Sequence, residues 1–168
     1  MKKNKFVAGL LTGVALAGGT ITVLKLKIFG KSTVEKGNNR TARLNSYYTV
    51  LSQWLINRNQ GKMIPEYLKK NNINSVAVYG MGTLGELLYQ ELKESGVKVT
   101  YFVDKNASEL YYGIDDLPVI GIEEMAGNEK VDAVIVTPVF DYDAVSEKIE
   151  NVGTDVNLMS LEDIIFDM

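Results

Sequence analysis

A glycine-spaced segment is the part of this chain whose residue types best suit ligand chemistry. It follows a short apolar run at 76–79 and opens a helical pattern of leucines from 84 to 92. In that context the first glycine permits a tight turn, the second lets a pyrophosphate approach the backbone, and the third lets the helix pack closely. The free amides at the helix start favour an anion. We therefore predict a phosphate-binding loop at Gly80, Met81, Gly82, Thr83, Leu84 and Gly85.

Three further residues complete the predicted binding set. Asp104 ends a second strand-like run at 97–103, where its carboxylate could accept hydrogen bonds from ribose hydroxyls and would oppose a 2′-phosphate. Lys105 follows it, and Thr137 follows a third apolar run at 131–136, where it either faces the ligand or caps the strand end. The predicted cofactor is NAD or a nucleotide-sugar. In the alternative interpretation the glycines serve only the turn, and Asp104 is an ordinary turn residue.

The composition excludes several kinds of chemistry. The chain has no Cys and no His, which excludes disulfides, thiolate nucleophiles, zinc–sulfur sites and His-based triads. Tyr101 and Lys105 have the spacing of the dehydrogenase Tyr/Lys pair, but Tyr101 falls in a predicted strand rather than a helix. The paired acids at 115–116 and 123–124 are typical of solvated turns. A net charge of -3 argues against a nucleic-acid partner. We predict no catalytic residue and no metal site.

The elements around the loop predict an α/β fold. Residues 75–168 alternate strand and helix patterns, which indicates a small doubly wound parallel sheet of about five strands in the order 3-2-1-4-5. A loop is expected at 106–116, one or two helical turns at 122–126, and a closing helix whose N-cap is Ser160. The strands are predicted at 76–79, 97–103, 117–120, 131–136 and 155–158, and the later helices at 143–151 and 160–165.

The N-terminal segment differs from the rest. Residues 6–24 carry no charge and would form about 28 Å of helix, the thickness of a bilayer core. We predict a single-pass membrane anchor, and the excess of basic residues after it places the C-terminal domain in the cytoplasm. A cleaved signal peptide and a buried soluble helix remain alternatives. Gly9, Gly13 and Ala17 have a spacing that suits pairing of two such helices.

A helical lead-in connects this anchor to the sheet. The expected organisation is an anchor at 1–29, a linker at 30–42, a lead-in at 43–74 and a Rossmann-type domain at 75–168. Apolar and aromatic residues recur at helical spacing between 44 and 55. This stripe is expected to cap the following domain or to form a dimer contact.

Residues 75–138 resemble the compact Rossmann-type domains of bacterial polysaccharide loci, among them the N-terminal nucleotide-sugar-binding domain of sugar acetyltransferases. Redox-sensing repressors and CoA-binding domains have a similar plan, and the stretch from Tyr47 to Leu68 resembles the lead-in of uncharacterised capsule-locus proteins. The chain lacks the hexapeptide-repeat domain of the acetyltransferases and the DNA-binding domain of the repressors. The resemblance therefore implies nucleotide binding and a membrane-bound polysaccharide-synthesis partner, but neither of those activities.

The sequence leaves three functions open. The first is a membrane-anchored sensor or accessory module that binds a nucleotide. The second is an NAD-dependent or sugar-modifying enzyme completed by a homodimer or a partner subunit. The third is a structural membrane adaptor that binds no ligand. Independent catalysis is disfavoured, because the residues after Asp104 suffice only to finish the sheet.

Overall fold

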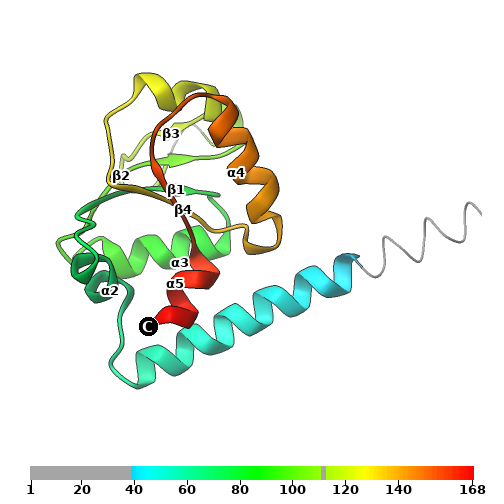
Figure 1. The fold of residues 1–168 in the computed structure, drawn as a ribbon, viewed down its shortest axis with the longest axis vertical. Helices are drawn as coiled ribbons and strands as arrows, with labels where there is room; N and C mark the ends of the chain where they lie inside the picture. Colours follow the sequence, from blue (N-terminus) through cyan, green and yellow to red (C-terminus); the bar gives the residue numbers. More distant parts are fainter. Residues whose placement is uncertain (1–38, 111–112) are drawn as a thin grey trace, which may run out of the picture. The chain divides into compact units, whose positions relative to one another are not determined.

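The computed structural model describes residues 39–110 and 113–168 (Figure 1). The chain divides into two compact units, Met1–Asn45 and Ser46–Met168. The predicted anchor at 1–29 and its glycine stripe lie outside the described residues. Within the described ranges, no helix combines the length and apolarity needed to cross a bilayer. Residues 39–59 are helical, so the last four positions of the expected linker belong to a helix.

The second unit is built on one sheet. Its five strands are paired in parallel in the order β3-β2-β1-β4-β5, which confirms the predicted sheet topology. β1 and β4 are buried along almost their whole length, as central strands covered on both faces must be. The strands are β1 (Ser75–Tyr79), β2 (Lys98–Val103), β3 (Val119–Ile120), β4 (Ala133–Val136) and β5 (Asn157–Ser160).

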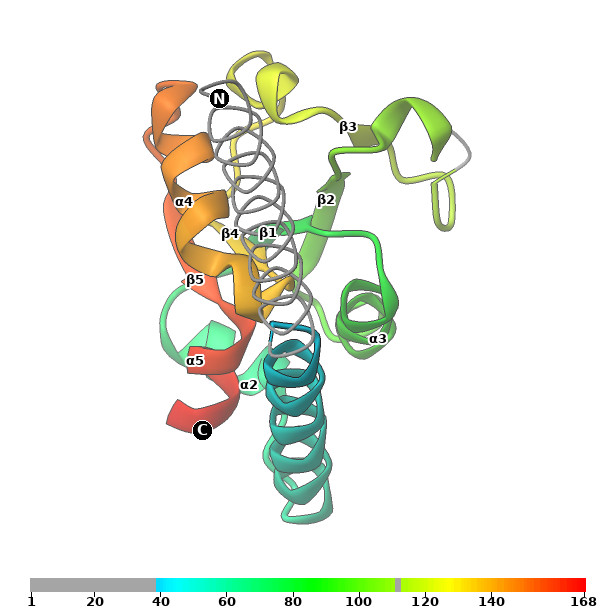
Figure 2. The ribbon, with the colours of Figure 1, turned by 90° about the vertical axis from the view of Figure 1, so that its right-hand side faces the viewer.

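Helices cover both faces of this sheet. Figure 2 shows α3 (Thr83–Leu92) and α4 (Tyr142–Asn151) on opposite sides of it. α2 (Ile64–Lys70), α5 (Leu161–Asp167) and residues 46–59, here called the lead-in helix, share a core cluster with α3. A second cluster joins α4 to the other face of the sheet. The arrangement is doubly wound, as predicted.

A bulge in β2 adjusts which side chains face each cluster. Val76 pairs with Val99, but the next residue of β1 pairs with Tyr101, so Thr100 is an extra residue. The insertion puts Val99 and Phe102 in the cluster beneath α3, while Tyr101 joins the cluster beneath α4. The Tyr89 and Phe102 rings pack edge to face, with centroids 5.6 Å apart and an interplanar angle of 70°.

Two predicted strands were misplaced. The third strand was expected at 117–120, but only Val119–Ile120 pairs with β2. Leu117 instead bridges Ile114 in a tight turn whose central residues, Asp115 and Asp116, have φ of 52° and 64°. The fifth strand was expected at 155–158 and lies two residues later.

The connecting segments agree better with expectation. The described residues include three short 3₁₀ helices, η1 (Ala107–Glu109), η2 (Ile122–Gly127) and η3 (Val139–Asp141), of which η2 corresponds to the helical turns predicted there. η1 lies inside the segment that was expected to be a loop. Ser160 caps α5, since its hydroxyl accepts a hydrogen bond from the Glu162 amide at 3.2 Å. This cap confirms the prediction for Ser160.

Candidate functional site

The first glycine of the loop makes the turn out of β1. Gly80 has φ of +96°, a region that side chains rarely adopt. A Cβ there would also lie 2.7 Å from Thr137 Oγ1. The Gly80 amide donates to the Val103 carbonyl at 2.8 Å, which extends the β1–β2 ladder by one bond. The fold itself therefore requires glycine at this position.

The third glycine allows α3 to approach the turn. A Cβ on Gly85 would lie 2.0 Å from the Gly80 carbonyl oxygen, which is closer than any real contact. The first turn of α3 therefore lies directly on the loop that precedes it. Gly85 is also required by the fold.

The second glycine is different. Gly82 has φ of −100° and ψ of −172°, an extended conformation open to any residue. A Cβ there would meet no atom within 4 Å. Gly82 is the N-cap of α3 and offers no side chain to the amides of the first turn. Neither strain nor packing explains a glycine here.

The Asp104 carboxylate supports the same loop from β2. Its Oδ2 accepts a hydrogen bond from the Met81 amide at 2.9 Å, and its Oδ1 accepts one from the Asn106 amide at 2.8 Å. Each oxygen retains capacity for another donor. Asp104 thus ties the glycine loop to the turn after β2. Met81 is half-buried and packs against the core.

Thr137 supports the loop from β4. Thr137 is buried, with 3% of the residue exposed. The Oγ1 hydroxyl lies within donor distance of two carbonyl oxygens, those of Tyr79 at 2.9 Å and Gly80 at 3.1 Å. Of the two roles considered for Thr137, the hydrogen bonds correspond to the cap at the strand end.

A cleft of about 490 Å³ opens above these elements. Of the predicted residues, Gly80, Gly82, Thr83, Leu84, Asp104 and Thr137 line it. Met81 and Gly85 are not among its lining residues, and Lys105 lines a neighbouring cleft of about 570 Å³ that shares Asp104. Sequence reasoning missed Tyr47, Leu51 and Pro138 as lining residues. The aromatic stripe of the lead-in was the signal available for the first two.

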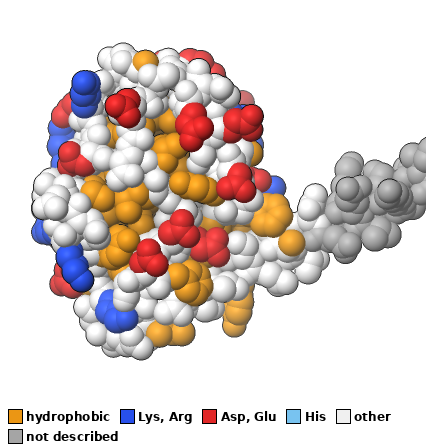
Figure 3. Space-filling model, viewed as in Figure 1, with side chains coloured by type: hydrophobic (Ala, Val, Ile, Leu, Met, Phe, Trp, Pro, Cys, Tyr) orange, Lys and Arg blue, Asp and Glu red, His pale blue; other side chains and the backbone are white. Residues whose placement is uncertain are grey.

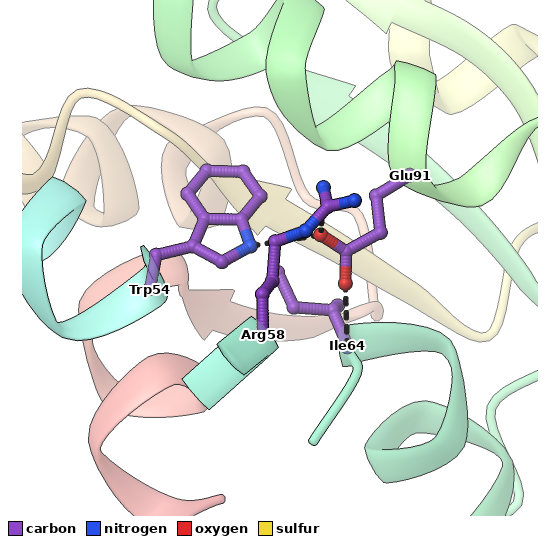
Figure 4. Close-up of polar contacts among 4 residues, drawn as sticks. All are labelled: Trp54, Arg58, Ile64 and Glu91. Atoms are coloured by element: carbon purple, nitrogen blue, oxygen red, sulfur yellow. Dashed lines mark hydrogen bonds and ion pairs between the residues drawn. The ribbon is translucent and has the colours of Figure 1, made fainter. Parts of the chain in front are cut away.

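Glu91 fixes the lead-in helix beside this cleft (Figure 4). Its side chain is 1% exposed. Oε2 accepts hydrogen bonds from Trp54 Nε1 at 2.9 Å and from Arg58 at 3.2 Å, and Oε1 accepts one from the Ile64 amide at 2.8 Å. The same carboxylate therefore joins α3, the lead-in helix and the start of α2. The wall formed by Tyr47 is held by this contact.

The charge around the cleft comes from few groups. Among the described residues that line the glycine-loop cleft of about 490 Å³ there is no Lys or Arg, so an anion there would be held by backbone amides. Figure 3 shows Asp and Glu side chains dispersed among apolar surface on one face of the chain. In the neighbouring cleft, burial first and then Asp104 and Glu123 raise the pKa of Tyr79 above its ordinary 10.0. Its phenol is therefore protonated at neutral pH and is not a general base.

A protein-family model matches the part of the chain that holds the glycine loop. No curated protein matches the chain. Residues 72–159, more than half of the chain, match a family described as C2185-like, N-terminal. This span begins just before β1 and ends within β5, so it contains the glycine loop, Asp104 and Thr137. The chain therefore belongs to the C2185-like, N-terminal family.

Proposed function

We propose that this chain is a nucleotide-binding sensor or accessory module, held at a membrane by residues 1–29, which binds the diphosphate of NAD or a nucleotide-sugar at the glycine loop. The observation that carries the proposal is Gly82. Of the three loop glycines, it alone has no structural requirement, and it borders open space in the cleft. A ligand that approaches the backbone would supply the missing requirement.

The start of α3 supports the same conclusion. Ser, Thr, Asp or Asn at an N-cap stabilises a helix by bonding its first amides. With Gly82 at this position, no side chain caps α3. A phosphate oxygen can take the place of that cap, because the amides and the helix dipole both favour an anion. The uncapped helix is thus better suited to a bound diphosphate than to an unliganded scaffold.

The rest of the cleft suits the remainder of a nucleotide. Its volume of about 490 Å³ lies within the usual range for small-molecule sites. The free lone pairs of Asp104 can accept hydrogen bonds from ribose hydroxyls, and Tyr47 and Leu51 offer an apolar wall. The state of the site would pass to a membrane-bound partner through the lead-in helix. The link to polysaccharide synthesis rests on the resemblance described above.

One observation favours a second function, a structural adaptor without a ligand. Both carboxylate oxygens of Asp104 already accept backbone hydrogen bonds, from Met81 and Asn106. The acid expected to bind ribose therefore has a role within the fold itself. In an adaptor, Gly82 would have no ligand to accommodate. Substitutions there would then have no effect on ligand binding.

A thermal-shift screen distinguishes the two functions. The full chain in detergent is tested with NAD, NADH, CoA, ATP and UDP-sugars, and a ligand at a hundredfold over Kd should stabilise it by about 2.7 kcal/mol. Gly82→Asp should abolish the shift without lowering the unliganded melting temperature, because Asp can cap α3. Gly127→Asp is the matched control, since Gly127 also borders open space but lies outside the cleft. A stable protein that shows no shift with any ligand would support the adaptor.

A further inference from the structure

The lead-in helix has an apolar stripe that the described part of the chain does not cover. Tyr48 is 74% exposed and Leu55 61%, and Leu51, which also borders the glycine-loop cleft, is 38% exposed. Between Arg43 and Arg58 the sequence has no charged residue. A helix face of this kind in contact with water is unusual, because solvated helix faces are normally charged.

The spacing of the stripe is that of a coiled-coil seam. Tyr48, Leu51 and Leu55 are separated by three and four residues. At about 100° per residue they fall within an arc of about 60°. This is the a/d pattern through which two helices interlock side chains. The stripe therefore fits a partner helix with the same spacing.

The opposite face of the helix is already occupied. Val50, Trp54 and Asn57 are buried against the domain, and Asn57 Nδ2 donates to the Ile165 carbonyl at 2.6 Å. A helix lying on a membrane surface would instead show Lys and Arg on that face. The lead-in helix is thus fixed on one side and apolar on the other.

We infer that this stripe pairs with the same stripe of a second copy of the chain. Two copies, each with net charge -3, can approach through a segment without charges and meet no like-charge repulsion there. Arg58, one heptad after Leu51, is neutralised by Glu91 and ends the seam. The pair is parallel, because two copies anchored by residues 1–29 enter one membrane in the same direction. That orientation rests on the proposed function.

The size of the stripe determines how firmly it pairs. Three apolar side chains from each copy bury less than the ~1,200 Å² typical of stable complexes. The pair therefore depends on concentration and is favoured where the chains are confined to one bilayer. Experiments on this pairing should therefore use the full chain in lipid nanodiscs or membranes.

Cysteine cross-linking tests this pairing, since the chain has no native cysteine. Tyr48→Cys or Leu55→Cys should each give disulfide-linked dimers under mild oxidation. Thr49→Cys, exposed but off the stripe, should stay monomeric. Cross-links formed only between Tyr48→Cys and Leu55→Cys chains would overturn the parallel orientation. Equal cross-linking at all three positions, or none, would overturn the pairing.

Charge insertion gives a second test that does not depend on cysteines. The double substitution Tyr48→Glu with Leu55→Glu should convert the dimer to a monomer, because like charges then meet across the seam. Light scattering measures this change in mass. Both side chains are exposed and line neither cleft, so the melting temperature and any nucleotide-induced shift should be unchanged. A dimer that survives this double substitution would overturn the proposal. If only the nucleotide-induced change in melting temperature were lost, the result would contradict the proposed function and not the pairing.

Discussion

Replacing Glu91 by Gln should loosen the lead-in helix from the domain. The carboxylate accepts three hydrogen bonds, from Trp54, Arg58 and the amide of Ile64, and its side chain is 1% exposed. Gln keeps the shape but has a single acceptor oxygen. Its NH₂ group must then face either the indole N–H or the amide that begins α2. One buried donor loses its partner.

The size of the effect follows from the environment of each partner. A buried donor without an acceptor costs about 1–3 kcal/mol. The lost ion pair adds little, because the Arg58 side chain is 51% exposed and its charge stays solvated. We therefore expect Glu91→Gln to lower the free energy of unfolding by about 2 kcal/mol. With a urea m-value of about 2 kcal/mol per M, the midpoint falls by about 1 M.

Trp54 is the single tryptophan of the chain, so its fluorescence reports this contact directly. Urea unfolding followed at that emission measures the midpoint, and Arg58→Gln is the matched control, with an expected loss below about 1 kcal/mol. Equal losses for the two variants, or a Glu91→Gln midpoint within error of wild type, would refute the reasoning.

Three further substitutions test the contacts that hold the glycine loop and the neighbouring strands in place. Gly85→Ala places a Cβ against a backbone carbonyl 2.0 Å away and should cost at least about 1–3 kcal/mol in urea unfolding; a stable variant would contradict the close approach. Thr137→Val removes a buried hydroxyl whose one proton lies within reach of two carbonyl oxygens, and it should cost about 1 kcal/mol by the same assay. An unchanged stability would contradict the supporting role of this hydroxyl. Hydrogen bonds from the Asn74 amide first, then from Ser75, hold the pKa of Asp132 below its ordinary 3.8. Its stabilisation is therefore present above that value and is lost as pH falls through the lowered pKa, so the melting temperatures of wild type and Asp132→Ala should differ at pH 7 and approach each other as pH falls below 3.8. A difference that is constant across this range would contradict the assignment.

Local patterns predicted the centre of the fold well. Strand β1, the glycine turn and α3 are adjacent in sequence, so the apolar run, the glycines and the leucine spacing of one segment were sufficient. The sheet order followed from the handedness of the crossovers. The edge strands were harder, because β3 has only two residues. Asp adopts positive φ more readily than most residues, but the local pattern did not place two such residues in succession, and these move Leu117 out of the strand.

The site was predicted only in part, because local sequence patterns describe one loop but not the contacts between distant segments. The turn and packing roles of Gly80 and Gly85 depend on the backbone of one loop, and the structure has both. The bond from Met81 to Asp104 depends on how two strands end beside each other, which no local pattern encodes. Tyr47 lines the cleft because Glu91 holds the lead-in helix in place, a contact between residues far apart in the chain.

The most direct test of the account is a titration of the ¹⁵N-labelled chain with ADP and with NAD, followed through its backbone amide resonances. We predict that the largest shifts occur at Gly82, Thr83 and Leu84, whose amides begin α3, and that Gly82→Asp removes them while the rest of the spectrum is preserved. Amides at α3 that stay unmoved at millimolar nucleotide, or shifts confined to another surface, would contradict a diphosphate site at the glycine loop.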